Sequence, residues 1–100
     1  AAALVRMVES LIAARLPHRL AEEDAARLVG TSRRTLVRRL AEAGCAFRPL
    51  LDRVLRERAR TMLAEGTQSR DEMATALGYT DATSFSRACR RWFGAKGVRG

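Results

Sequence analysis

The chain is poor in aromatic residues, prolines and cysteines, and it contains a single lysine. With only five aromatic residues in 100, its core must be largely aliphatic. Cys45 and Cys89 lie far apart with no disulfide framework around them, which fits free thiols in a reducing compartment. The sequence has no signal peptide and no apolar run near the roughly 18 residues of a membrane span. We therefore expect a soluble, cytoplasmic domain, and the missing initiator Met indicates a fragment of a longer protein.

The charge balance is strongly basic, with 19 Lys and Arg residues against 11 acidic residues and a net charge of +8. All of these cations but one are arginine, whose guanidinium forks onto phosphate and guanine in a way that lysine cannot. This balance favours a polyanionic partner, nucleic acid before membrane. Genomic codon bias is an alternative reason for arginine over lysine, but it does not explain the net excess of positive charge.

Apolar residues recur at helical spacing along most of the chain. Residues 21–28 form one predicted helix, in which Ala25, Ala26 and Leu28 are available for packing. Hydroxyl residues at Ser32, Ser69 and Thr80 are suited to cap the helices that follow them. The whole pattern predicts an all-α fold, with helices over residues 4–16, 21–28, 33–43, 46–64, 70–77 and 81–93.

Two segments that lie 48 residues apart are similar to one another. Residues 26–32 align with residues 74–80, and each copy consists of a short helix, a glycine turn and a capped helix. This arrangement is the helix-turn-helix pattern. The small residues Ala26 and Ala74 would let the two helices of each copy approach closely. Beyond the turn, where the second copy has one extra residue, Leu36 and Leu40 correspond to Phe85 and Cys89.

The repeat predicts a first helix-turn-helix subdomain at residues 1–45, a linker helix at residues 46–64 and a second subdomain at residues 65–100. A linker of this length, at 1.5 Å per residue, is about 28 Å long. Successive major-groove segments on one face of DNA lie about 34 Å apart. One monomer could therefore place two recognition helices in adjacent major-groove segments.

These motifs resemble the DNA-binding domain of the AraC/XylS family of bacterial transcription regulators, over residues 4–94. Residues 30–40 are similar to the first recognition helix of that family, and residues 47–59 are similar to its linker helix. Residues 76–94 are the most specific part of the resemblance. The resemblance implies a bilobed fold of about seven helices, with double-stranded DNA and RNA polymerase as partners. It also implies a separate effector or dimerisation domain elsewhere in the protein. Because regulators of this family are more often activators, we expect an activator. The chain departs from the family pattern at Cys45, Leu55-Arg56, Ala82, Cys89 and the tail after Gly94.

Candidate DNA contacts lie on the second helix of each copy. The family pattern places base contacts at Arg34 and Arg38, with Val37 nearby, and arginine can take guanine O6 and N7 together. The alternative for the arginines of the first copy is a solvated basic face that touches only phosphate. The alternative for Arg87 in the second copy is a salt bridge to Asp81 or Glu72, and the alternative for Ser32 and Thr80 is a role as helix caps alone. In the second copy, on the predicted helix over residues 81–93, the outward candidates for base contact are Ala82, Thr83, Ser86 and Arg87. The candidates for phosphate contact are Ser32, Arg33, Thr35, Thr80, Arg90 and Arg91.

The sequence carries no pattern typical of catalysis or of a cofactor site. It has no nucleophile beside a histidine base, no paired catalytic carboxylates and no phosphate-binding loop. The lone His18 has no partner at metal-ligand spacing. We therefore expect no enzyme, no metal and no cofactor, and we expect Tyr79, Phe85 and Trp92 to serve the core. Besides a sequence-specific regulator, a non-specific nucleic-acid-binding module and a helical protein-interaction domain remain open.

Overall fold

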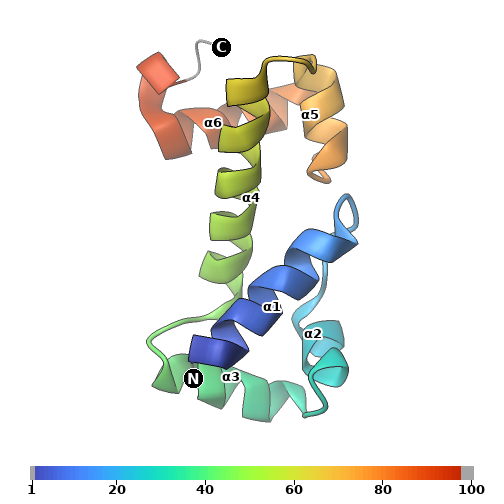
Figure 1. Ribbon diagram of the computed structural model, residues 1–100, viewed down its shortest axis with the longest axis vertical. Helices are drawn as coiled ribbons and strands as arrows, with labels where there is room; N and C mark the ends of the chain where they lie inside the picture. The colour runs from blue at the N-terminus through green and yellow to red at the C-terminus, as the bar shows by residue number, and fades with distance from the viewer. Residues whose placement is uncertain (1, 98–100) are drawn as a thin grey trace. The chain divides into compact units, whose positions relative to one another are not determined.

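The computed structural model describes residues 2–97, and for residues 95–97 it describes the backbone alone. Within this range the chain forms six helices and no strand, which confirms the predicted all-α fold (Figure 1). Six helices compare with the roughly seven predicted, but Gly94 (φ 72°, ψ −178°) has a non-helical backbone within the last one and divides it into two helical segments, which confirms the predicted break at Gly94. Residues 98–100 of the predicted tail lie outside the described residues. The helices are α1 (Ala2–Arg15), α2 (Glu22–Leu28), α3 (Arg33–Glu42), α4 (Phe47–Glu65), α5 (Arg70–Ala76) and α6 (Ala82–Gly97).

The chain divides into two compact units, and the boundary between them falls within α4. The first unit (residues 1–54) holds α1, α2, α3 and the first turns of α4. The second unit (residues 55–100) holds the rest of α4 with α5 and α6. The predicted limits of a separate linker helix, at residues 46–64, stay a prediction. None of the described helices is both long and apolar enough to cross a membrane.

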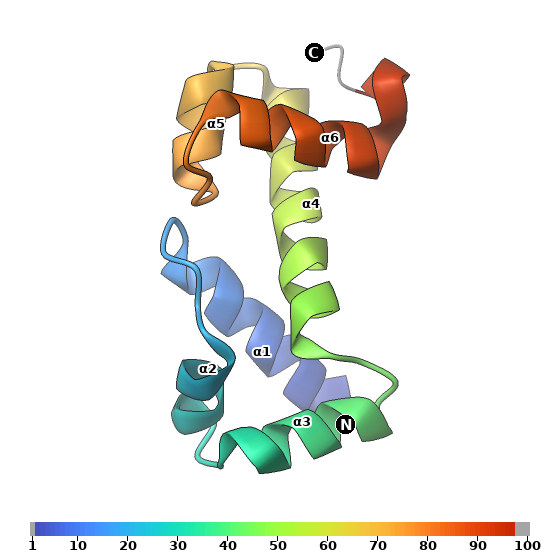
Figure 2. The ribbon, with the colours of Figure 1, turned by 180° about the vertical axis from the view of Figure 1, so that it is seen from behind.

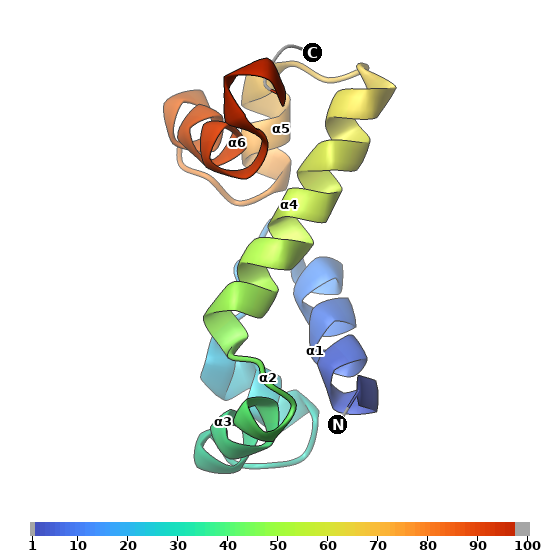
Figure 3. The same cartoon turned by 90° about the vertical axis from the view of Figure 1, so that its left-hand side faces the viewer.

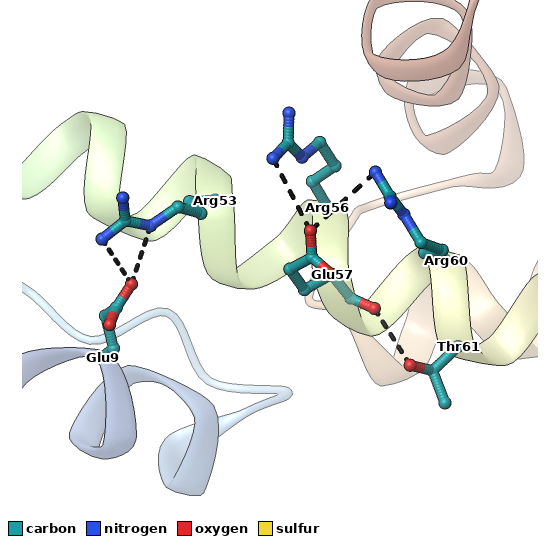
Figure 4. A network of polar contacts seen from close by, with 6 residues as sticks. All are labelled: Glu9, Arg53, Arg56, Glu57, Arg60 and Thr61. Carbon is teal, nitrogen blue, oxygen red and sulfur yellow. Dashed lines mark hydrogen bonds and ion pairs between the residues drawn. The ribbon is translucent and has the colours of Figure 1, made fainter. Parts of the chain in front are cut away.

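The first unit is built on the apolar stripes of its helices. Helix α2 packs against both α1 and α3, and α1 runs past the first turns of α4, where Glu9 and Arg53 form an ion pair at 2.7 Å (Figures 3 and 4). The prediction that Leu28 packs in this core is wrong, since the residue is 45% exposed. At about 100° per residue, Leu28 is turned by roughly 110° from the middle of the face formed by the buried Ala25 and Ala26, which places it beyond the edge of that face. The core residues are Val8, Ile12, Leu20, Ala25, Ala26, Leu36, Leu40, Phe47, Leu50 and Leu51.

The second unit repeats this plan with different side chains. Ser69 caps α5 as predicted: its Oγ accepts a hydrogen bond from the Glu72 amide at 3.1 Å, and Glu72 Oε1 accepts one from the Ser69 amide at 2.7 Å. Phe85 is fully buried, whereas Tyr79 is half-buried and packs on it with ring centroids 5.7 Å apart. Trp92 is also half-buried. The core residues are Leu55, Ala59, Met73, Ala74, Leu77, Phe85, Ala88 and Cys89.

Candidate nucleic-acid interface

A short connection that contains a glycine leads into α3 and into α6 (Figure 2). These glycines, Gly30 and Gly78, have φ of 80° and 81°. In both copies the amide after the glycine donates to the carbonyl oxygen five residues earlier, on Ala26 or Ala74, at 2.9 Å. A helix that ends in this way needs a positive φ, which glycine adopts without strain from a Cβ atom. The 48-residue repeat predicted from sequence is therefore confirmed in the backbone.

Each of these two helices is held to its unit by one fully buried pair of side chains. Leu36 and Leu40 anchor α3, Phe85 and Cys89 anchor α6, and all of them are 0% exposed. Residues four apart share a helix face, so each pair fixes which side of its helix points outward. Burial raises the pKa of the Cys89 thiol above its ordinary value, although the nearby positive charge of Arg70 opposes the shift. Cys89 therefore packs as a neutral, apolar residue.

The caps of the two helices differ, and one prediction about them is wrong. Ser32 caps α3 as expected, because its Oγ accepts a hydrogen bond from the Thr35 amide at 3.1 Å. Thr80 does not cap α6, which begins at Ala82; instead Asp81 Oδ1 accepts from the Ser84 amide at 2.7 Å. The extra residue of the second copy moves the cap position by one. Hydrogen bonds from Ser84 lower the pKa of Asp81, and the positive charge of Arg87 lowers it further.

The outward face of α3 carries the predicted base-contact residues of the first unit. Arg34 and Arg38 are exposed, and neither makes a hydrogen bond or ion pair with another described residue. Val37 is 45% exposed, which is unusual for a large apolar side chain in this molecule. These side chains are thus held outward by the buried pair and are available to a partner. Their contact with bases stays a prediction.

The outward face of α6 is less charged. Thr83 and Arg87 are exposed, while Ala82 is half-buried. No ion pair joins Arg87 to another described residue, so the alternative salt bridge to an acidic neighbour is not formed. Ser86 is half-buried, and its Oγ accepts a hydrogen bond from Nη1 of Arg70 at 3.0 Å. Ser86 therefore has an intramolecular partner that the sequence did not predict.

The predicted phosphate-contact residues differ in their surroundings. Thr80 and Arg90 are exposed, whereas the Arg91 guanidinium lies 5.4 Å from the centroid of the Trp92 ring. Ser32 donates its hydroxyl to Thr35 Oγ1 at 3.0 Å, so these two side chains bind each other. Arg33 forms an ion pair with Glu22, from Nε to Oε1, at 3.4 Å.

An open groove of about 750 Å³ lies beside α3. Its charged lining consists of Arg19, Arg33, Arg48 and a single acidic residue, Glu22. Arg19 and Arg48 were not predicted as contacts, because they lie outside the two helix-turn-helix copies. Glu22 and Arg70 were also missed; extending the aligned repeat by four residues toward the N-terminus would have paired them. Within residues 2–97 no three potential metal-ligating side chains gather at one place.

Comparisons with known proteins agree with this geometry. The family described as "Helix-turn-helix domain" matches residues 25–96. The HTH-type transcriptional regulator VqsM of Pseudomonas aeruginosa is 38% identical over 69 residues, which cover 69% of this chain and 21% of that protein. The chain thus spans about a fifth of the length of the curated relatives it matches.

Solved structures show the same fold. The transcriptional regulator CdpR of P. aeruginosa superposes with a TM-score of 0.79 at 35% identity, over 91% of this chain and 29% of that one. A transcriptional regulator of Chromobacterium violaceum, described as an AraC-type DNA-binding domain-containing protein, gives a TM-score of 0.81 at 24% identity. That match covers 98% of this chain and 95% of the other.

Proposed function

Since the chain belongs to the AraC-type family of helix-turn-helix DNA-binding domains, we propose that α3 and α6 enter two adjacent major-groove segments of one DNA duplex. The observation that carries this proposal is the duplicated geometry. Each helix follows the same turn, is held by a fully buried pair, and presents an outward face with exposed arginine. A helix fixed on one side and cationic on the other suits the major groove.

In this proposal the arginines specify bases and the flanking groups bind phosphate. Arg34 and Arg38 on α3, and Arg87 on α6, bind guanine edges with two hydrogen bonds each. Val37 on α3 and the small residues of α6 allow close approach to thymine methyl groups. Phosphate contacts come from Ser32, Arg33 and Thr35 in the first unit and from Thr80, Arg90 and Arg91 in the second.

The regulatory role is a wider part of the same proposal. The curated relatives are named as transcriptional regulators, and this chain corresponds to about a fifth of them. We place an effector or dimerisation domain in the remaining part of such a protein, and RNA polymerase among its partners. The protein would then act in the bacterial cytoplasm, as an activator that recruits the polymerase to DNA.

Selection of bound duplexes from a random library at moderate salt tests the central claim. We expect a motif of two conserved blocks about one helical turn, or roughly 10 base pairs, apart. Recovery of unrelated sequences would contradict specific binding and support a non-specific module. Absence of any binding at low salt would support a protein-interaction domain instead, because phosphate contacts are strongest there.

A further inference from the structure

Glu22 and Arg70 occupy the same position in the two units. They lie 48 residues apart, and each is the first residue of the helix that precedes the turn. Each is bonded to the candidate recognition helix of its own unit: Glu22 to Arg33 on α3 at 3.4 Å, and Arg70 to Ser86 on α6 at 3.0 Å. The two equivalent positions therefore carry opposite charges and touch equivalent helices.

In the first unit the carboxylate lies among arginines. Among the described residues, Glu22 is the only acidic one that lines the groove beside α3, where Arg19, Arg33 and Arg48 also lie. Its side chain is 22% exposed, whereas that of Arg33 is 61% exposed, so the guanidinium is the more accessible partner. A DNA phosphate that approaches Arg33 must compete with this carboxylate and is also repelled by it.

In the second unit the equivalent residue adds positive charge. The outward face of α6 presents Arg87 among small side chains, in contrast to the arginine-rich α3. Arg70 donates to the hydroxyl of Ser86, which sits next to Arg87 in the chain. The charge of Arg70 also acts on Cys89, one turn further along α6. The positive charge of α5 therefore reaches α6.

We propose that Glu22 and Arg70 set the sequence-independent attraction of each unit to DNA phosphate, Glu22 by weakening it at α3 and Arg70 by strengthening it at α6. This inference rests on the DNA binding proposed above. Neither residue has to touch a base to affect specificity. Glu22 lowers the attraction of α3 to every duplex, whatever its sequence. Base contacts then supply a larger share of the affinity, and this raises the ratio of specific to non-specific binding.

The first test replaces Glu22 with the uncharged Gln and uses a labelled duplex of scrambled sequence. E22Q should bind this duplex about two- to fivefold more tightly, the range for an exposed charge pair. The slope of log Kobs against log salt should steepen by about 0.9, the value for one additional phosphate contact. The matched control is E23Q, which removes the same charge from the next residue of α2, where the exposed Glu23 makes no hydrogen bond or ion pair with a described residue. Equal effects of E22Q and E23Q would overturn the proposal for the first unit.

The second test uses Arg70 with the same duplex. R70Q should weaken binding about two- to fivefold and make the salt slope shallower by about 0.9, whereas R70K, which keeps the charge, should retain the wild-type slope. The control is R58Q, because Arg58 is exposed in the same unit and has no described partner. If Arg70 serves only to orient Ser86, R70Q would leave the slope unchanged, and this would overturn the proposal for the second unit.

A selected duplex in parallel separates this inference from the function on which it rests. Wild-type protein that prefers the selected duplex over the scrambled one supports the proposed function. If that preference holds while E22Q matches E23Q and R70Q matches R58Q, only the inference about charge fails. If the wild type shows no preference, the proposed function fails as well.

Discussion

The two units have nearly the same backbone but different chemistry. Their turn glycines differ by one degree in φ, at 80° and 81°, and their anchoring pairs are all 0% exposed. In contrast, four of the ten residues of α3 are arginine, whereas α6 has Ala82 and Thr83 at positions equivalent to Arg33 and Arg34. Only Arg38 and Arg87 keep the same residue type on the outward faces, 49 residues apart.

This difference shows which constraints belong to the fold and which to the partner. The buried face must supply apolar side chains of fitting volume, because a close-packed interior tolerates few changes. Leu36 can then become Phe85 and Leu40 can become Cys89, provided both remain buried. The outward face has no such requirement, so its charge can diverge. We infer that the first unit contributes more to electrostatic attraction and the second more to fit.

The largest expected effect comes from removing one anchor in each unit. Phe85→Ala should lower the free energy of unfolding by about 3–5 kcal/mol and Leu36→Ala by about 2–5 kcal/mol, because each leaves a cavity in a packed core. Urea unfolding followed by circular dichroism and by the fluorescence of Trp92, the single tryptophan, which lies in the second unit, measures both.

The matched control for the anchors is Val37→Ala, at a position on α3 that is 45% exposed. It should change the free energy of unfolding by no more than about 0.5 kcal/mol, as surface substitutions generally do. If Phe85→Ala costs no more than Val37→Ala, the two buried pairs are not equivalent anchors.

The next effect concerns the one outward residue that the two units share. Arg38→Ala and Arg87→Ala should each lose about 1–3 kcal/mol of discrimination between bases, but in different blocks of the DNA motif. Competition with duplexes mutated in one block at a time measures this. Arg39→Ala is a suitable control, since Arg39 is exposed on α3 without a described partner and should weaken binding uniformly. Loss of the same block in both arginine variants would contradict the two-segment arrangement.

Sequence alone predicted those features that depend on neighbouring residues. The helices, the caps Ser32 and Ser69 and the anchor pairs all follow from spacings of three or four residues, and the structure confirms them. The exposure of Leu28 was missed because α2 is short. In a short helix the spacing of apolar residues does not show whether the last one faces the core or the solvent. The cap of α6 was missed because one inserted residue moves it from Thr80 to Asp81.

The remaining features depend on how helices cross, which spacing does not reveal. The Glu22–Arg33 pair joins residues 11 apart in the chain, and the Arg70–Ser86 hydrogen bond joins residues 16 apart. Each contact forms because a glycine turn returns one helix across the other. The groove beside α3 is similar, since its arginines come from the segment before α2, from α3 and from the start of α4. No local pattern links these elements.

A smaller effect tests whether the two turns are alike. Gly30→Ala should lower stability by about 1–2 kcal/mol, the cost of a left-handed conformation for a residue with a Cβ atom. A Cβ atom at Gly30 would have no atom within 4 Å, so this cost comes from the backbone and not from a clash. Gly78→Ala should behave in the same way at φ of 81°. Gly30→Asn should cost less, because asparagine enters this region more readily. Equal stability of Gly30→Ala and the wild type would show that the turn can rearrange.

The smallest effect separates the two caps by their response to acid. Ser32→Ala should cost about 1 kcal/mol at any pH, because a hydroxyl cap does not titrate. The pKa of Asp81 is lowered in the folded protein by hydrogen bonds from Ser84, so its stabilisation is complete at neutral pH and is lost as the pH falls through that lowered pKa.

Unfolding of the second unit, followed by Trp92 fluorescence between neutral and acidic pH, tests this contrast. Asp81→Asn keeps a capping oxygen but cannot be protonated, so it should reduce the acid-induced loss of stability, whereas Ser32→Ala should leave the wild-type pH dependence intact. If Asp81→Asn retains the full acid sensitivity, the cap of α6 is not its source. The two caps would then be equivalent in their pH response, and the contrast between the units would lie in their outward faces alone.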